Sequence, residues 1–495
     1  MVLSESTPSL SDLPPDILLY ILQFCDLLTH VNLVTVCITF NVLSQQRGYW
    51  INALRNARLN RPIACPLRED LLKHDLQSLK RITFHTLRLE RNWSSPEPQV
   101  HGPIKAVMLG LPVLDVIFQV PGTALYVLHS RSTGTIAAWD IDLGRRVTPE
   151  IRISRRVLDV SPGQDELGKF SMGLLTSGAP NNELLVICLE YGKADVNLSV
   201  ILRYTLKPNM FNWAVFMTTG YVGVLQCRFE EIINGEGTTV DIVALNLSSK
   251  NATTIQTDIP REMFAHNEGQ SGTSISNRDL FILVEWKDES HLFRCPKKYL
   301  PHDDNPDCPS TSSLKCLNPS FSHKWTHPGV AEYTDTEGAL SADEFYGVPA
   351  VSLHRITAPR LDSEGDVEPD LTHKIQIRFW TKPEPDPGNE KSPPHLIPRH
   401  SVNIPGLLQD SPDSSWQLML LPHSGRKVLL VVYYESEICL KLIHFDPEEG
   451  ISFVQQVTLP PFINVEEVYG LSLDDHLGVI SLLDTKGVLY AIPYA

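Results

Sequence analysis

From about residue 100 onward the sequence repeats one unit, which is a pair of apolar, β-branched runs separated by a short turn. In residues 125–142 the runs LYVLHS and TIAAWD flank the turn-forming residues Ser132, Thr133 and Gly134. The unit occurs at residues 125–142, 183–206, 221–247, 279–295, 351–380, 427–446 and 477–494. Because no helical pattern of convincing length interrupts these runs, residues 100–495 are predicted to form one large all-β domain.

Recurrent hairpins of this kind favour a β-propeller of about seven irregular blades, and a stacked or open β-sandwich is the alternative. Only Trp139-Asp140 matches the dipeptide that marks WD repeats. We expect residues 108–120 to add a strand to the last blade and close the ring. The polar, proline-containing stretches 300–345 and 382–398 are expected to be loop insertions between strands.

The first 95 residues have a different, helical periodicity. Apolar residues follow a spacing of three to four through LPPDILLYILQFCDLL, and Pro14 and Pro15 stand where a helix begins. A second helix is expected from Thr29, a candidate N-cap, and a third through residues 42–54. Residues 66–91 continue with helical spacing. The chain is therefore predicted to be a multi-domain α+β protein, with a three-helix domain at 1–60, a helical linker at 61–99 and the β domain at 100–495.

Charge is unevenly distributed along the chain. The net charge is −16, and residues 1–95 carry ten basic and eight acidic side chains, which leaves −18 for residues 96–495. Such an acidic surface repels phosphate backbones and anionic lipids, so neither nucleic acid nor membrane is an expected partner. It favours a basic protein partner over a phosphorylated one, unless arginines gather locally on one face. The nine cysteines contain no CxxC pair and no signal peptide is visible, which predicts a reduced cytoplasmic or nuclear protein.

The N-terminal helices resemble the F-box family. F-boxes begin with Leu-Pro followed by an acidic residue and aliphatics, continue to a Val-Cys pair, and finish near a tryptophan. Here the matching positions are Leu13-Pro14, Val36-Cys37 and Trp50, with Asp16 in the acidic slot. The residue after Val-Cys, often basic in the family, is Ile38. The following segment TLRLERNWSS (86–95) resembles the one that follows the F-box in expanded fungal F-box families.

The resemblance implies a substrate-recognition subunit of an SCF-type ubiquitin ligase. The F-box would bind a Skp-type adaptor, which connects to cullin and RING subunits, while the β domain would bind an unidentified protein client. The adaptor-binding residues implied are Leu13, Pro14, Ile17, Leu18, Ile21, Leu33, Val36, Cys37, Phe40 and Trp50. The sequence alone does not divide them between adaptor contact and core packing. An adaptor-bound scaffold acting outside the ligase is an alternative.

A catalytic role is not expected, although a propeller-fold hydrolase with a helical appendage is a further alternative. No P-loop, dinucleotide-binding, nucleophile-elbow or HExxH motif occurs. The cysteines and histidines at 295–327 have spacings that fit no zinc finger and are interpreted as incidental residues of a polar loop. No metal and no other cofactor is therefore predicted.

Overall fold

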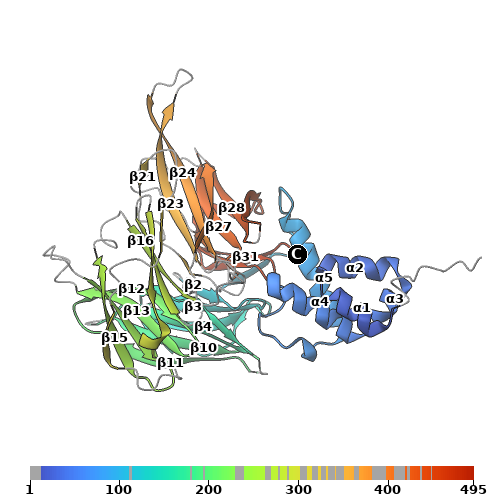
Figure 1. Ribbon diagram of the computed structural model, residues 1–495, viewed down its shortest axis with the longest axis horizontal. Coiled ribbons are helices and arrows are strands. Elements are labelled where there is room, and N and C mark those ends of the chain that lie inside the picture. Colours follow the sequence, from blue (N-terminus) through green and yellow to red (C-terminus); the bar gives the residue numbers. More distant parts are fainter. Residues whose placement is uncertain are drawn as a thin grey trace, which may run out of the picture.

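In the computed structural model the helices lie at one end of the molecule, beside the β domain (Figure 1). The structure describes residues 13–110, 114–178, 181–192, 195–228, 239–261, 269–276, 279–286, 289–301, 309–314, 321–324, 330–332, 340–341, 350–361, 367–381, 397–405, 419–420, 424–434, 437–447 and 449–495. The predicted combination of N-terminal helices and a large β domain is confirmed.

The helical region, here called the helical module, contains five α-helices. They are α1 (Pro15–Leu22), α2 (Leu27–Val36), α3 (Ile38–Leu43), α4 (Arg47–Asn60) and α5 (Leu76–Trp93). Four of them lie before residue 61, so the prediction of three was wrong. The third predicted helix is divided because the chain turns at residues 44–46, where the Ser44 hydroxyl bonds back to Asn41 O at 2.7 Å. Residues 61–75 contain only a short 3₁₀ helix, Leu71–Lys73, ahead of α5.

Helix starts follow the expected capping chemistry with one correction. Asp26, and not Thr29, caps α2, and its carboxylate accepts a hydrogen bond from Thr29 N at 2.7 Å. Asp75 caps α5 in the same way, by accepting from Ser78 N at 2.7 Å. The helix α1 begins with proline at its first position, where no backbone donor is needed.

In the described part of the β domain there are seven sheets, called blades 1 to 7, and their strands pair antiparallel except for one parallel pair in blade 3. Blade 1 contains β2 (Leu114–Gln119), β3 (Leu125–Ser130), β4 (Thr135–Asp140), β5 (Arg145–Arg146) and β6 (Ile151–Arg152). Blade 2 contains β7 (Val157–Val160), β8 (Gln164–Glu166), β9 (Lys169–Thr176), β10 (Glu183–Glu190) and β11 (Asn197–Thr205). Blade 3 contains β12 (Met210–Met217), β13 (Tyr221–Arg228), β14 (Thr239–Asn246), β15 (Ala252–Pro260) and, paired in parallel, β19 (Thr311–Leu314).

Blades 4 to 7 complete the domain. Blade 4 contains β16 (Gly269–Ser276), β17 (Asp279–Trp286), β18 (Glu289–Cys295) and β20 (Phe321–Lys324). Blade 5 contains β21 (Val330–Glu332), β22 (Leu340–Ser341), β23 (Ala350–Leu361), β24 (Val367–Thr381) and β25 (Ile397–Pro405). Blade 6 contains β26 (Met419–Leu420), β27 (Lys427–Tyr434), β28 (Glu437–Asp446) and β29 (Ile451–Val457). Blade 7 contains β30 (Val468–Asp474), β31 (Val479–Asp484), β32 (Val488–Pro493) and β1 (Lys105–Met108).

The blades form a closed ring, which confirms the predicted propeller and excludes the sandwich. Contacts run from β30 to β2, β6 to β11, β7 to β12, β12 to β16, β16 to β22, β25 to β29 and β26 to β30, so each blade touches the next and the last touches the first. Each of the seven predicted hairpins lies in a different blade. Middle strands such as β10 and β13 are buried along most of their length because neighbouring blades cover both of their faces.

Two details of the β domain differ from expectation. The ring-closing strand is β1, which pairs with β32 from Lys105 to Met108, so it ends where the expected segment 108–120 begins; β2 instead opens blade 1. The stretch 300–345, expected to be a loop, contributes the short strands β19 to β22 to blades 3, 4 and 5. Short strands inside a polar segment carry too little apolar alternation to be recognised. In the expected insertion 382–398, residues 382–396 lie outside the described residues.

The helical module is joined to blades 6 and 7 by direct contacts. His476 Nδ1 lies 2.9 Å from Ile63 O and 3.0 Å from Cys65 O, and His85 Nε2 lies 2.8 Å from Leu477 O. Asn92 donates to Tyr494 O at 2.6 Å. Leu89 and Trp93 of α5 pack with buried residues of blades 6 and 7. Hydrogen bonds between side chains and backbone carbonyl oxygens, together with shared apolar packing, fix the helices against the propeller.

Gly122, in the turn between β2 and β3, permits a close approach of two backbone segments at this junction. Its φ is +75°, and a Cβ added there would lie 2.5 Å from the backbone carbon of Cys65 and 2.6 Å from Pro66 N. We expect Gly122→Ala to force residues 61–67 away from the propeller, because backbone atoms cannot rotate aside. Hydrogen exchange of the amides in 61–75 should accelerate. Gly144→Ala is the matched control, since Gly144 has a φ of +62° and nothing within 4 Å of the added Cβ; equal exchange in both variants would contradict the packing argument.

Candidate protein-interaction surfaces

The ten F-box residues singled out from the sequence divide clearly by exposure. Leu18, Phe40 and Trp50 are buried in the core of the helical module. The half-buried residues are Leu13, Leu33 and Cys37. The exposed ones are Pro14, Ile17, Ile21 and Val36. Only the last group is fully available to a partner, whereas the first group holds the helices together.

Trp50 shows why the buried residues serve the core. Its side chain is 1% exposed, packs edge-on against Tyr49 and donates from Nε1 to Ser44 O at 2.7 Å. Tyr49 in turn donates to His30 O at 2.9 Å. These bonds connect α4 to the end of α3 and to α2. Both large rings therefore satisfy their polar atoms inside the module, as buried aromatic residues require.

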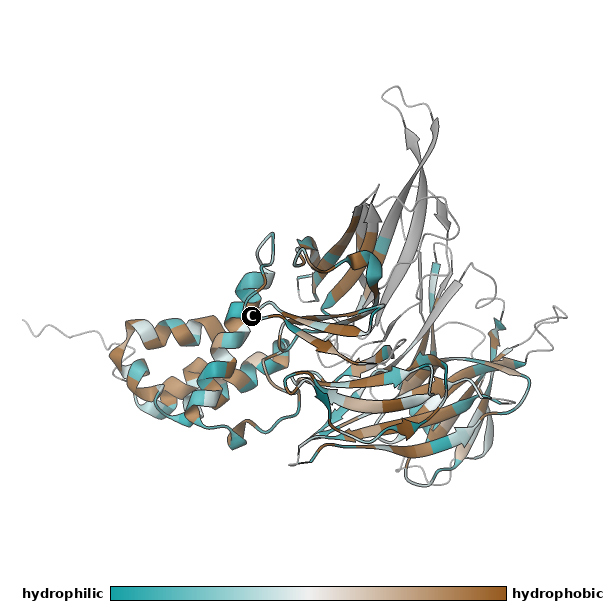
Figure 2. Cartoon of the chain, turned by 180° about the vertical axis from the view of Figure 1, so that it is seen from behind, coloured by the Kyte–Doolittle hydropathy of each residue, from teal (hydrophilic) through white to brown (hydrophobic). Residues whose placement is uncertain are grey.

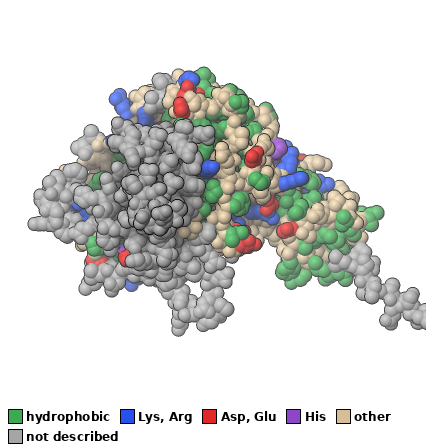
Figure 3. Space-filling model, turned by 90° about the horizontal axis from the view of Figure 1, so that it is seen from above, with side chains coloured by type: hydrophobic (Ala, Val, Ile, Leu, Met, Phe, Trp, Pro, Cys, Tyr) green, Lys and Arg blue, Asp and Glu red, His purple; other side chains and the backbone are tan. Residues whose placement is uncertain are grey.

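The module also exposes an unusual amount of apolar side chain, here called the apolar surface. Its members are Ile17, Tyr20, Ile21, Phe24, Leu28, Val36, Ile38 and Val42. Ile17, Tyr20, Ile21 and Phe24 follow helical spacing on one face of α1 and its end, and the Tyr20 and Phe24 rings are 5.6 Å apart. Brown and green areas in Figures 2 and 3 show hydrophobic residues gathered over this module. Exposed apolar residues in such numbers indicate a protein-binding site.

Five members of the apolar surface were not among the binding residues predicted from the sequence, namely Tyr20, Phe24, Leu28, Ile38 and Val42. The helical spacing indicated a broad apolar stripe, but it does not say which edge of the stripe remains uncovered. Ile38 is the most informative of them. It stands in the position that is often basic in F-boxes, and at 82% exposed it is the most exposed large apolar residue among those described.

The propeller has a second candidate surface at the ends of the strands opposite the helical module. The turn after β3 and the segment between β6 and β7 meet there, because Ile153 N donates to Gly134 O at 2.8 Å and Ser177 N donates to Arg156 O at 3.0 Å. The opposite ends of these strands face the helical module. Gly122 lies there between β2 and β3, and its backbone N–H donates to Asp474 at the end of β30. We call this side the far face of blades 1 and 2.

Arginines gather on the far face, at Arg131, Arg152, Arg155 and Arg156, and all four side chains are exposed. Arg131 Nε donates to Asp115 Oδ2 at 2.6 Å. The other three side chains have no ion-pair or hydrogen-bond partner among the described residues. This arginine cluster is a local exception to the acidic charge of the β domain, and it removes the argument from net charge against a phosphorylated partner.

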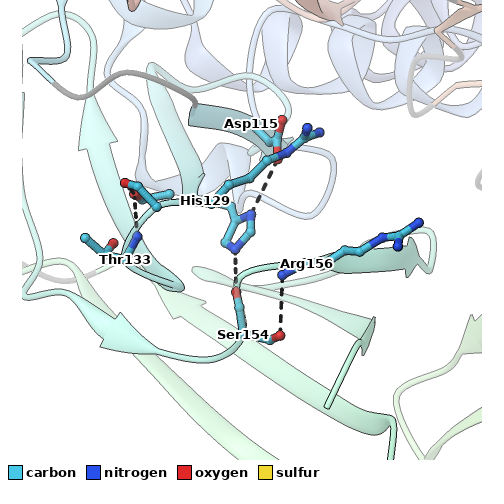
Figure 4. A network of polar contacts seen from close by, with 8 residues as sticks. Asp115, His129, Thr133, Ser154 and Arg156 are labelled. Carbon is cyan, nitrogen blue, oxygen red and sulfur yellow. Dashed lines mark hydrogen bonds and ion pairs between the residues drawn. The ribbon is translucent and has the colours of Figure 1, made fainter. Parts of the chain in front are cut away.

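A network of hydrogen bonds around the buried His129 supports the arginine cluster (Figure 4). His129, which is fully buried, bonds through Nε2 to Ser154 O at 2.6 Å and lies 3.5 Å from Asp115 Oδ2 through Nδ1. Burial raises the pKa of Asp115, but hydrogen bonds from His129 and Arg131 outweigh it and hold the pKa below its usual value. Asp115 therefore stays ionised and fixes the two elements that carry the arginines.

The same network contains serine, histidine and aspartate but does not form a nucleophilic triad. His129 Nε2 contacts the backbone oxygen of Ser154, while the Ser154 hydroxyl donates to Ser177 O at 2.5 Å. A triad requires the histidine to accept the serine proton. Of the thiols and imidazoles at 295–327, Cys295 is buried in blade 4 and His323 lies in β20, whereas His302, Cys308, Cys316 and His327 fall outside the described residues.

The described part of the chain contains neither a metal-binding cluster nor a membrane-spanning helix. No group of three or more metal-ligating side chains there is arranged to hold an ion. No helix there combines the length and apolarity needed to cross a membrane.

Comparison with known proteins gives one family match. The model of the F-box domain matches residues 10–52, which include α1, α2, α3 and the start of α4. No curated protein matches the chain. Among solved structures, Hsv2 from Kluyveromyces lactis covers 69% of this chain and 84% of its own, with 9% identity and a TM-score of 0.33. The Dos1 propeller covers 75% of each chain, with 7% identity and a TM-score of 0.34.

Proposed function

We propose, from the F-box domain at residues 10–52, that this chain is the substrate-recognition subunit of an SCF-type ubiquitin ligase. In this account the F-box binds a Skp-type adaptor, which brings cullin and RING subunits, and the propeller binds a protein client. The chemistry of ubiquitin transfer belongs to the other subunits. This chain contributes proximity, because holding a client beside the loaded conjugating enzyme raises its effective concentration.

The apolar surface is the observation that carries the proposal. Its aliphatic and aromatic side chains are exposed on the segment that the F-box family covers, while Leu18, Phe40 and Trp50 keep that segment folded from inside. An interface of this composition gains most of its affinity from burying large apolar side chains. We infer that the adaptor contacts Pro14, Ile17, Ile21 and Val36 of the implied set, and Tyr20, Phe24, Leu28, Ile38 and Val42 beside them.

The contacts between module and propeller support a positioning role. His476, His85 and Asn92 each bond to backbone atoms across the junction, so the propeller is held in one orientation relative to the F-box. A fixed orientation places a bound client at a defined distance from the transfer site. The far face of blades 1 and 2 points away from the helical module and is not covered by it.

We infer that the far face binds an anionic segment of the client. Guanidinium groups form paired hydrogen bonds with carboxylates and phosphates. The side chains of Arg152, Arg155 and Arg156 form no ion pair with an acidic side chain among the described residues. The side chain of Arg156 extends away from the His129 network (Figure 4). Either glutamate-rich or phosphorylated segments present the required groups.

The double variant Arg155→Glu/Arg156→Glu is expected to weaken binding of the full-length chain to anionic client peptides at least about tenfold, because each lost charged contact contributes about 1.5–3 kcal/mol. Binding is measured by fluorescence anisotropy with phosphoserine-containing and glutamate-substituted versions of one peptide. Arg88→Glu/Arg91→Glu, on exposed positions of α5, changes the net charge equally and serves as control. Equal losses in both double variants would show a nonspecific charge effect and contradict the assignment.

The whole proposal is tested by co-purifying the full-length chain with a Skp-type adaptor, a cullin and a RING subunit. A stable four-protein assembly is expected. Adaptor binding without cullin recruitment would instead support the scaffold alternative. Failure of the full-length chain to bind any adaptor would overturn both.

A further inference from the structure

A cavity of about 240 Å³ lies at the junction of the helical module and the propeller. One side consists of the end of α4 and one face of α5, including Arg61, Leu89 and Trp93. The other consists of blades 6 and 7, including Lys427, His444 and Asp475. It is distinct from both surfaces described above, since none of the apolar surface or the arginine cluster lines it.

Lys427 is the group in this cavity that most requires explanation. Its ammonium nitrogen lies 4.8 Å from the centre of the Trp93 ring, and no ion pair or hydrogen bond connects it to any described residue. Burial lowers the pKa of Lys427, against the opposing field of Asp475. Lys427 is half-buried, so its ammonium group, which has no ion pair among the described residues, remains accessible to an anionic ligand.

Some polar groups near Lys427 have hydrogen-bond or ion-pair partners, and others have none among the described residues. Arg61 is paired with Glu90, and Asp475 Oδ2 accepts a hydrogen bond from the Ser424 hydroxyl. In contrast, Trp93 Nε1 has no acceptor and Asp475 Oδ1 has no donor among the described residues, although both atoms are buried. Buried polar atoms are rarely left without a partner, and each such atom calls for an explanation. Here two donors on facing walls of the cavity, Lys427 and Trp93, lack a hydrogen-bond acceptor among the described residues.

Aromatic rings form part of the cavity wall beside these polar groups. The His444 and Phe453 rings stack with centres 4.5 Å apart and planes 7° from parallel, and Trp93 lies 6.4 Å from His444. Burial lowers the pKa of His444 to about 3, so its ring stays neutral. Flat, neutral rings of this kind suit the apolar body of a ligand.

We propose that this cavity binds a small organic anion, with one carboxylate or phosphate group on Lys427 and Trp93 and a flat apolar body against His444 and Phe453. The volume is slightly below the range of about 300–1,000 Å³ usual for small-molecule sites, which favours a compact metabolite over a nucleotide. Glu90, Asp446 and Asp475 line the same cavity and disfavour a second anionic group. A hydroxyl group on the ligand would satisfy Asp475 Oδ1.

Such a ligand would bridge the two parts of the chain. Because its walls come from α5 on one side and from blades 6 and 7 on the other, occupancy would stabilise the orientation of the propeller relative to the F-box. The ligand site itself does not depend on the proposed ligase function.

The test is isothermal titration calorimetry of the full-length chain with four probes. Phenylacetate and phenyl phosphate carry the anionic group and the ring, inorganic phosphate lacks the ring, and phenylacetamide lacks the charge. We expect at least one of the two ring-containing anions to bind at least tenfold more tightly than inorganic phosphate and phenylacetamide. Absence of binding by both ring-containing anions, or equal binding of the matched uncharged probe, would overturn the proposal.

Variants assign the binding to this cavity. Lys427→Met is expected to weaken the tightest probe at least tenfold, and Trp93→Phe to weaken it less while preserving the ring. Lys441→Met, on β28, is the control, because the Lys441 ammonium already bonds to Gln456 Oε1 at 3.3 Å. Unchanged binding in Lys427→Met would contradict the assignment. Adaptor binding is measured on the same variants, and variants that still bind the adaptor are folded. If the wild-type chain binds the ligand but no adaptor, only the ligase proposal is refuted.

Discussion

Replacing Val36 by lysine and Ile38 by glutamate is expected to abolish adaptor binding while the helical module stays folded. Val36 is 79% exposed and Ile38 is 82% exposed, so neither contributes to the core. Val36 ends α2 and Ile38 begins α3, where a cation and an anion, respectively, are favoured by the helix dipoles. Placing two charges in an apolar interface should cost at least about 2–4 kcal/mol of binding free energy, which is about 30-fold or more.

The measurement for this double variant is the dissociation constant of the full-length chain for a Skp-type adaptor, together with its circular dichroism spectrum. Leu143→Glu is the control, since Leu143 is 58% exposed but lies in the propeller turn after β4. Wild-type affinity in the double variant would show that the adaptor does not use the α2–α3 turn. A changed helical signal would show that the charges disturb the fold, and the exposure argument would then be wrong.

Trp50→Ala is expected to destabilise the helical module by about 3–5 kcal/mol, the usual cost of removing a large buried aromatic side chain. The variant loses the packing of a side chain that is 1% exposed and also its hydrogen bond to Ser44 O. Because whole domains are stable by only about 5–15 kcal/mol, the module should open frequently. Amide hydrogen exchange in α2 to α4 should accelerate about 100-fold or more.

Trp50→Phe separates the two contributions of this residue. It retains a ring in the core but leaves Ser44 O without its donor, so its exchange rates should fall between those of the wild type and Trp50→Ala. Blades 1 to 7 should exchange as in the wild type in both variants, apart from residues at the junction. Wild-type protection of α2 to α4 in Trp50→Ala would contradict the assignment of Trp50 to the core.

Local patterns in the sequence were sufficient to predict much of the architecture. Each predicted hairpin joins strands that are adjacent in sequence, and such pairs are specified by nearby turn residues and β-branched runs. Pairings between distant segments were not predictable. The strand β19 returns to blade 3 after most of blade 4 is complete, and β1 closes blade 7 from almost 400 residues away. Both strands are short, so their own residues carry little information about their partners.

The candidate sites were likewise predictable only where residues close in sequence determine them. The F-box residues were recognisable from their order and spacing, but the separation of buried Phe40 from exposed Ile38 depends on how α3 packs against its neighbours. The arginines at 152, 155 and 156 are visible in the sequence, within a region whose net charge is strongly negative. Their meeting with Arg131 requires the turn after β3 to pack against residues 153–156. The cavity around Lys427 combines α5 with blades 6 and 7 and has no local signature at all.

The central claim is that the apolar surface of the F-box is an adaptor-binding site on an intact, full-length chain. It is tested most directly by mixing the purified chain with a purified Skp-type adaptor and measuring the mass of the complex by light scattering during gel filtration. The account predicts a one-to-one complex that persists on the column and is lost in the Val36→Lys/Ile38→Glu variant. Separate elution of the two proteins, or a complex that the double variant forms equally well, would contradict it.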